Sequence, residues 1–254
     1  MMNTVTLGMT GLRVSRLAFG TGTHGWAHHS QQTALGIEGL AKLLTLGFER
    51  GVTFWDVADQ YGSHPHVARA LQDVPRDEVV IATKTTSRTK RATANDVDRF
   101  LEEMETDRID IVLLHSMRGG NWPRRHSGAM AALTEAKAAG KVRAVGVSCH
   151  SLAALRAAVT TPWVEVVLVR INHAGVRMDG SLAEVVPVIK RLHEAGKGVY
   201  GMKVLGCGQL TDGVSRAFEY VLNLGTVHAM TVGMSSRDQL LENIDTVEAL
   251  TAQG

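Results

Sequence analysis

Short apolar segments alternate with stretches of helical periodicity along almost the whole of this chain. The apolar segments lie at 15–20, 52–58, 78–84, 109–115, 142–148, 164–171, 198–205 and 226–233. Each precedes a stretch in which apolar residues recur with the period of a helix, and these stretches lie at 33–50, 64–72, 94–106, 128–139, 151–159, 181–195, 213–223 and 236–250. Strands that are apolar on both faces are typical of a parallel sheet covered by helices. Eight such units in 254 residues predict an α/β protein with a single (β/α)8 TIM-barrel domain over residues 1–254.

Glycines and the first residues of the chain agree with this interpretation. Gly51, Gly140 and Gly196 stand where a predicted helix ends and a strand begins, a position that favours glycine because the backbone turns left-handed there. Residues 4–14 place apolar side chains around two glycines, which predicts a short β-hairpin that closes the bottom of the barrel. The alternative is a doubly wound open sheet, but the G-x-G-x-x-G turn expected after an early strand of that fold is not present.

Composition narrows the function classes. The net charge is only +2, the acidic and basic residues are mixed, and no basic run would hold a nucleic acid or an acidic membrane. Two cysteines are too few for a disulfide framework. No stretch is long and apolar enough for a membrane span, and the first residues lack the pattern of a signal peptide. We therefore expect a cytoplasmic protein with a small-molecule partner, and the sequence does not reveal the oligomeric state.

Polar side chains follow the apolar segments where the chemistry of a TIM barrel is found, at the carboxyl ends of the strands. Asp56 ends the second strand, with Tyr61 in the loop beyond it, while Lys84 ends the third and His115 the fourth. These four types fit one reaction. A nearby ammonium lowers the pKa of a phenol, a carboxylate keeps the ammonium charged, and an imidazole can hydrogen-bond a substrate oxygen. Such a tyrosine could protonate a carbonyl oxygen while a cofactor delivers hydride to the carbon.

The sequence resembles the aldo-keto reductase superfamily over nearly its whole length. The motifs that carry the resemblance are LGMTGLRVSRLAFGTG (7–22), FWDVADQYGSHPHVARAL (54–71), VVIATK (79–84), DRIDIVLLHSM (107–117), GKVRAVGVS (140–148) and VGMSSRDQLLENI (232–244). The resemblance implies that Tyr61 is the proton donor, that Lys84 and Asp56 tune it, and that His115 orients the carbonyl. Asp59 has no counterpart in these motifs and is interpreted as a turn residue.

The same resemblance implies a nicotinamide nucleotide as cofactor, with NADPH expected and NADH as the alternative. Some positions depart from the family: Cys149 replaces an Asn, Leu168 replaces a Gln, and Met202 replaces an aromatic residue. The family's cationic grip on a 2′-phosphate appears as Gly233 and Gln239, although Arg237 or Lys203 could reach a phosphate. The candidate cofactor-binding residues are Gly20, Thr21, Ser148, Asn172, Met202, Lys203, Met234, Ser235, Ser236, Arg237, Gln239, Glu242 and Asn243.

Three alternatives for function stay open. The first is an NAD(P)H-dependent reductase of aldehydes, ketones or sugars, and the second is an alcohol or aldose dehydrogenase that runs the same reaction in reverse. The third is a low-turnover nicotinamide-nucleotide-binding regulatory protein, which the altered amide-binding positions favour. Trp26 and Trp122 are the expected walls of an open substrate pocket. The HHS and HPH segments (28–30 and 64–66) could ligate a metal, but no cysteine or carboxylate cluster completes a site in the sequence, so no metal is expected.

Overall fold

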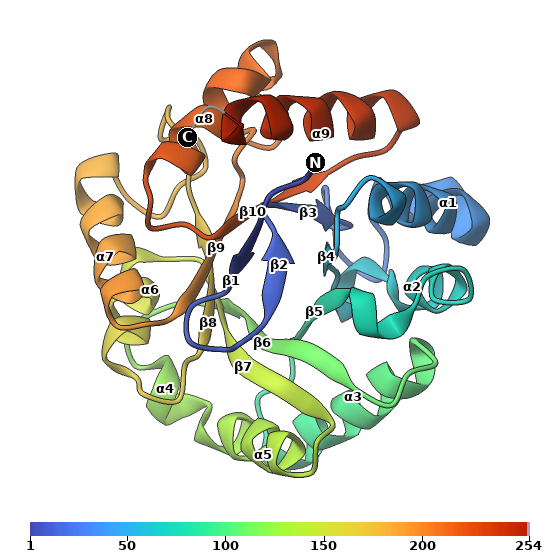
Figure 1. Cartoon of the computed structure of the whole chain (residues 1–254). Helices are drawn as coiled ribbons and strands as arrows, with labels where there is room; N and C mark the ends of the chain where they lie inside the picture. The colour runs from blue at the N-terminus through green and yellow to red at the C-terminus, as the bar shows by residue number, and fades with distance from the viewer. Residues whose placement is uncertain (253–254) are drawn as a thin grey trace.

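The computed structural model describes residues 1–252 and shows a closed eight-stranded parallel barrel inside a ring of helices (Figure 1). The strands follow one another around the barrel in chain order, and the last pairs with the first. They are β3 (Leu17–Gly20), β4 (Phe54–Asp56), β5 (Val80–Thr85), β6 (Ile109–Met117), β7 (Val142–Cys149), β8 (Val166–Arg170), β9 (Gly198–Met202) and β10 (Ala229–Gly233). The (β/α)8 fold predicted from the alternating segments is confirmed.

Helices connect the strands and form the outer ring. The main ones are α1 (Gly36–Glu49), α2 (His64–Ala70), α3 (Lys90–Glu103), α5 (Ser127–Ala138), α6 (Leu152–Thr160), α7 (Leu182–Glu194), α8 (Val214–Asn223) and α9 (Arg237–Thr251). The single turn α4 (Trp122–Arg125) was not predicted from the sequence, because four residues are too few for helical periodicity to emerge. Gly51, Gly140 and Gly196 have φ values of 86°, 76° and 75°, which confirms the left-handed helix ends.

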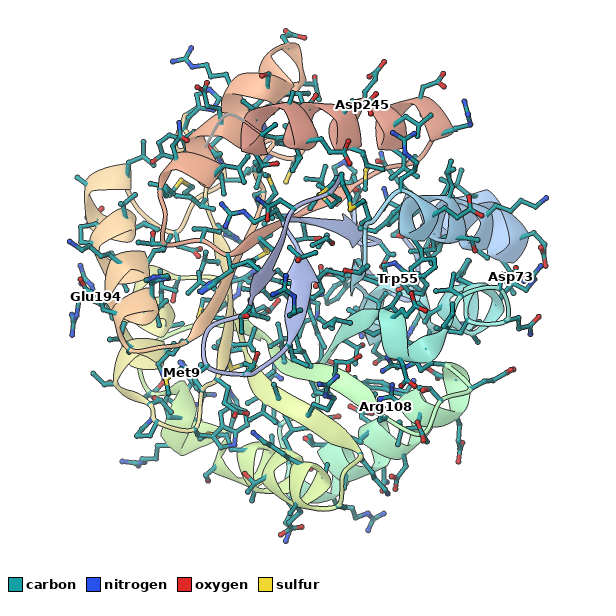
Figure 2. All side chains as sticks on the ribbon, in the orientation of Figure 1. Met9, Trp55, Asp73, Arg108, Glu194 and Asp245 are labelled. Carbon is teal, nitrogen blue, oxygen red and sulfur yellow. The ribbon has the colours of Figure 1, made fainter. Side chains whose placement is uncertain are left out.

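Two apolar layers stabilise the barrel. One lies between the strands and the outer helices and includes Phe19, Trp55 and Phe100; the other fills the barrel and includes Phe54 and Ile111. Figure 2 places charged side chains such as Asp73, Glu194 and Asp245 on the outer elements. No helix within residues 1–252 is both long enough and apolar enough to cross a membrane.

The N-terminal hairpin closes the lower end of the barrel, as the sequence predicts. Strands β1 (Thr4–Thr6) and β2 (Arg13–Ser15) pair antiparallel, and they lie across the middle of the ring in Figure 1. Leu7, Leu12 and Val14 are fully buried and belong to the cluster that fills the barrel. The hairpin is also bonded to the barrel, because the Met9 N–H donates to Gly196 O at 2.8 Å. The lower end is therefore sealed, which leaves the carboxyl ends of the strands for a ligand.

Candidate active site

A buried ion pair lies at the centre of the upper end. Lys84, on β5, donates from Nζ to Asp56 Oδ1 at 2.7 Å and to Val57 O at 2.8 Å, and its side chain is completely buried. Tyr200 also donates to Asp56 Oδ1 at 2.9 Å, while Thr231 reaches Oδ2 at 3.3 Å. Three donors around one carboxylate offset the cost of removing its charge from water. Sequence reasoning missed Tyr200, since it lies inside β9 in an apolar segment.

Tyr61 is carried by a short 3-10 turn after β4, η2 (Asp59–Tyr61), which ends at Gly62 in a left-handed conformation with φ 65°. Its ring lies directly against Gly22 and Gly25 of the loop after β3, where an added Cβ would overlap the ring atoms. Lys84 Nζ lies over the ring, 5.0 Å from its centroid. The glycines and the ammonium together fix where the phenol hydroxyl points.

His115, near the end of β6, completes the group predicted from the sequence. Its Nε2 lies 3.5 Å from Tyr61 Oη, and the two rings meet edge to face with centroids 5.7 Å apart. Burial, together with the positive charge of Lys84 and neighbouring cations, lowers the pKa of His115 to about 2. The imidazole is therefore neutral near pH 7, and with the proton on Nε2 it can donate to an oxygen placed beside Tyr61.

The electrostatics of Tyr61 differ from the expectation that Lys84 lowers the pKa of the phenol. Burial and the charge of Asp56 instead raise the pKa of Tyr61 above its ordinary value. The ammonium does not compensate, because its hydrogen bonds go to Asp56 and Val57 rather than to the phenol. Burial outweighs Asp56 at Lys84 too, and lowers its pKa. Tyr61 therefore holds its proton at neutral pH, as a general acid must.

A cavity of about 720 Å³ extends from Tyr61 along the ends of β9 and β10 to the first turns of α9. Its volume is within the range of sites for small molecules and cofactors. The candidate cofactor residues that line it are Gly20, Met202, Lys203, Ser235, Gln239, Glu242 and Asn243. Leu168 is also in its wall, as are Asp56 and Tyr61. The cavity therefore joins two of the residues predicted as catalytic, Asp56 and Tyr61, to much of the predicted nucleotide site.

The remaining candidate cofactor residues lie outside the lining of this cavity. Ser148 Oγ accepts the Ser116 N–H at 2.8 Å, and Thr21 Oγ1 bonds Asp56 O at 3.1 Å. The amide of Asn172 donates to Val176 O and Lys203 O and accepts from the N–H groups of Ala174 and Val176. Met234 is buried, Ser236 caps α9, and Arg237 is exposed on its first turn. The Asn172 amide thus bonds the backbone of its own loop and of the loop after β9.

The two predicted substrate walls have different surroundings. Trp26 lies in the loop after β3 and is 73% exposed. Trp122 is fully buried in the outer apolar layer, and its Nε1–H donates to Ala154 O at 3.2 Å. The prediction that Trp122 lines the substrate pocket is therefore wrong. The turn of α4 packs its indole against α6, because burial there satisfies both the ring and its N–H.

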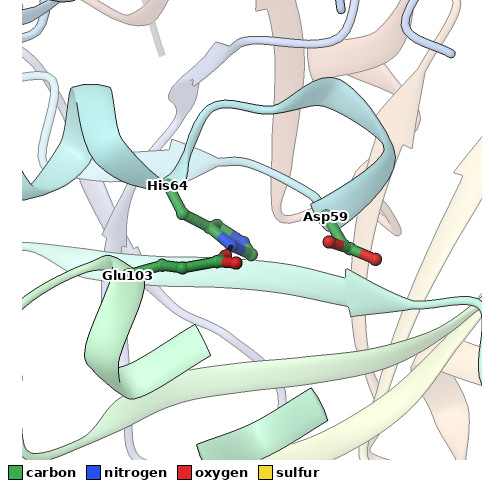
Figure 3. Close-up of side chains that lie close together, drawn as sticks. All are labelled: Asp59, His64 and Glu103. Carbon is green, nitrogen blue, oxygen red and sulfur yellow. Dashed lines mark hydrogen bonds and ion pairs between the residues drawn. The ribbon is translucent and has the colours of Figure 1, made fainter. Parts of the chain in front are cut away.

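Asp59, His64 and Glu103 form a cluster that sequence spacing did not reveal, because Glu103 comes from α3 (Figure 3). One ligand atom from each lies within 4.8 Å of the others. These atoms already have partners: Arg99 Nη1 donates to Asp59 at 2.9 Å and to Glu103 at 2.7 Å, while His64 Nδ1 lies 2.7 Å from Glu103 Oε2. The cluster is therefore an ion-pair network in which the cation is Arg99, and it anchors the turn that carries Tyr61.

Comparisons with known proteins identify the family and its fold. The model of the aldo/keto reductase family matches residues 16–220. L-galactose dehydrogenase of Arabidopsis thaliana is 25% identical over 98% of this chain and 89% of its own. A Pseudomonas aeruginosa protein described as an aldo-keto reductase superposes with a TM-score of 0.82 at 26% identity, covering 98% of this chain and 95% of that one. An aldo-keto reductase of Bacillus halodurans, 19% identical, has the same fold, with a TM-score of 0.80 over 98% of this chain and 91% of its own.

The family match covers most of the chain and includes Asp56, Tyr61, Lys84 and His115. Aldo/keto reductases are oxidoreductases that act on carbonyl groups with a nicotinamide cofactor. The chain belongs to the aldo/keto reductase family.

Proposed function

We propose that this protein is an NAD(P)H-dependent reductase of aldehydes or ketones in which Tyr61 is the general acid. The observation that carries the proposal is the contact between Tyr61 and His115, 3.5 Å apart, beside the buried pair of Lys84 and Asp56. A phenol and a neutral imidazole at this separation can both donate to one carbonyl oxygen that lies within hydrogen-bond distance of each. Such an oxyanion site stabilises charge that develops on the substrate oxygen.

Each group then has a distinct role. The bound nicotinamide would supply the hydride, which no side chain can provide. As negative charge grows on the carbonyl oxygen, the Tyr61 proton passes to it from Oη, while His115 donates from Nε2 and keeps its proton. Lys84 stabilises the phenolate left behind through its charge, 5.0 Å from the ring centroid. Asp56 favours the protonated form of Lys84 and so opposes the larger effect of burial, which lowers the Lys84 pKa.

The extent and lining of the cavity favour a dinucleotide as the cofactor. The cavity begins at Tyr61 and reaches the N-terminus of α9, where backbone N–H groups and the helix dipole favour an anion. Met202 could pack on a nicotinamide ring through its sulfur, and Lys203 could bind the diphosphate. We propose NADPH, with Arg237 at the start of α9 as the contact for the 2′-phosphate. NADH is the alternative, because Gln239 is uncharged and its Oε1 accepts the Ser235 N–H at 2.9 Å.

The second candidate function is a dehydrogenase of alcohols or sugars. The similarity to L-galactose dehydrogenase over 98% of the chain favours it. In that direction Tyr61 would accept the proton, because the reverse reaction passes through the same transition state. A low-turnover nucleotide-binding protein is the third candidate; the engaged amide of Asn172 and the apolar Leu168 support it.

The decisive variant is Tyr61→Phe, which removes the proton donor and keeps the ring between Gly22 and Gly25. We expect carbonyl reduction to fall by at least about a thousandfold, while nucleotide binding, followed by quenching of the four tryptophans, stays as in the wild type. Tyr220→Phe on α8 is the matched control and should keep full activity. Retained turnover in Tyr61→Phe would refute the assignment. Titrating the wild type with NADPH and NADH separately decides the nucleotide, and binding of neither would refute the cofactor proposal.

A further inference from the structure

Four successive strand ends beside His115 carry side chains that attract anions. Arg118 follows β6, His150 follows β7, Arg170 ends β8, and Lys203 follows β9. The backbones at these strand ends are paired with one another. The His150 N–H donates to Met117 O at 2.9 Å, and Arg170 lies opposite Met202 in the register of β8 and β9. The four residues therefore occupy one continuous arc of the upper rim, here called the cationic arc.

Positive charge in the cationic arc exceeds negative charge. Arg170 donates to Asp179 Oδ1 at 3.1 Å. For Arg118 and Lys203, residues 1–252 supply no carboxylate within ion-pair distance. Arg118, Arg170 and Lys203 with the single carboxylate of Asp179 leave a surplus of two positive charges. The pKa values respond to this field: burial and then Arg170, Arg118 and Lys203 lower the pKa of His150 to about 3.

Arg170 also determines which proton His150 carries. Its Nη2 donates to His150 Nδ1 at 2.6 Å, and an arginine can only donate, so Nδ1 must accept and the proton lies on Nε2. The rings of His150 and His115 are nearly perpendicular, with centroids 6.3 Å apart. His150 Nε2–H is therefore a neutral donor whose ring neighbours the imidazole that binds the carbonyl oxygen, and no acceptor for it is found in the described part of the chain.

Members of the cationic arc lie in two different surroundings. Lys203 lines the cavity in which we place the nucleotide, whereas Arg118 and His150 do not. Arg118 is exposed to solvent beyond His115, at the end of the same strand. An arginine at this position is suited to binding an anionic group of a substrate, because its guanidinium binds a carboxylate or phosphate through two parallel hydrogen bonds.

We infer that the substrate is an anionic carbonyl compound, such as an oxo acid, whose carboxylate or phosphate is bound by Arg118 and His150 while its carbonyl oxygen accepts hydrogen bonds from Tyr61 and His115. This inference rests on the proposed function and adds the substrate class to it. Arg170 is a positioning residue in this arrangement, since it acts by fixing the tautomer of His150.

The test compares two aldehydes that differ in charge, 4-carboxybenzaldehyde and its neutral methyl ester. We expect wild-type kcat/KM to be at least about tenfold higher for the acid, and Arg118→Gln to lower it for the acid roughly tenfold or more, with a much smaller effect on the ester. Arg124→Gln, which removes an exposed arginine of α4 six positions along the chain, is the control and should leave both values unchanged. Raising the ionic strength should weaken use of the acid alone.

Three results would overturn the inference: equal use of the two aldehydes, equal effects of Arg118→Gln on both, or a loss of nucleotide binding in Arg118→Gln as large as the loss in kcat/KM. The last would assign Arg118 to the cofactor. If neither aldehyde reacts, the proposed function fails, and the cationic arc is then tested by calorimetry with terephthalate. Binding to the wild type that weakens about tenfold in Arg118→Gln would uphold the anion site, and no binding would refute it.

Discussion

His115 links the chemistry of the site to the stability of the protein. Its pKa is lowered to about 2 in the folded chain, first by burial and then by Lys84, from an ordinary value of 6.5. Below pH 6.5 the His115 imidazole is protonated in the unfolded chain but stays neutral in the folded chain. The free energy of unfolding therefore falls as the pH decreases from 6.5 towards 2. At pH 4.5 this single group should cost about 2–3 kcal/mol relative to pH 7.

Urea unfolding at pH 7 and at pH 4.5 checks this value. His115→Gln removes the titrating group and keeps a side chain that can hydrogen-bond, so the variant should lose about 2–3 kcal/mol less than the wild type over this interval. His150→Gln is a useful comparison, since burial also lowers the pKa of His150. If the wild type and His115→Gln lost the same free energy of unfolding between pH 7 and pH 4.5, His115 would have to be protonated in the folded protein at pH 4.5.

At the same scale, the sequence predicted Asp56, Tyr61, Lys84 and His115 as one group because each follows an apolar segment and the fold brings strand ends together. Tyr200 and Arg99 could not be predicted this way. Tyr200 reaches Asp56 from β9, three strands away around the barrel, and Arg99 reaches Asp59 from a helix. Both contacts depend on side-chain direction and reach, which hydrophobic periodicity does not encode. The fully buried Trp122 shows the reverse error, where an aromatic after a strand was given a role it lacks.

At the scale of elements, the loop after β3 and the turn η2 meet at Tyr61. Gly25 has no room for a side chain, because an added Cβ would overlap the Tyr61 ring. Gly25→Ala should therefore push the ring away from His115 and lower kcat by roughly ten- to a hundredfold, since small displacements of a reacting group are costly. Steady-state kinetics with saturating nucleotide would measure the change.

A matched control for this variant is Gly213→Ala, before α8. Gly213 has no heavy atom within 4 Å of the added Cβ, and its φ of −142° lies outside the left-handed region that favours glycine. We expect unchanged kcat there. If Gly25→Ala were also fully active, the contact between Gly25 and the ring would not determine the position of the phenol.

Element boundaries were predictable to the extent that burial follows periodicity. The long, strongly apolar β6 and β7 agree with their predicted segments within two residues. The predicted segment 52–58, by contrast, contains a β4 of only three residues, Phe54–Asp56. Apolar residues continue past Asp56 because Val57 and Ala58 are buried in the loop that leads to Tyr61. These two residues are buried in a loop and not in a strand, so the apolar segment is longer than the strand that it contains.

At the scale of the whole molecule, the barrel separates stability at its lower end from chemistry at its upper end. Leu7 of the hairpin is fully buried in the barrel and packs against Gly198, where β9 begins. Leu7→Ala should lower the free energy of unfolding by about 2–5 kcal/mol, the usual cost of a large-to-small change in a core. It should leave kcat unchanged at 25 °C, because Asp56, Tyr61, Lys84 and His115 all lie at or beyond the opposite ends of their strands.

Met9→Ala, two residues away and 86% exposed, is the control and should change stability by less than about 0.5 kcal/mol. A loss of kcat in Leu7→Ala at a temperature where the variant stays folded would show that the two ends of the barrel are coupled.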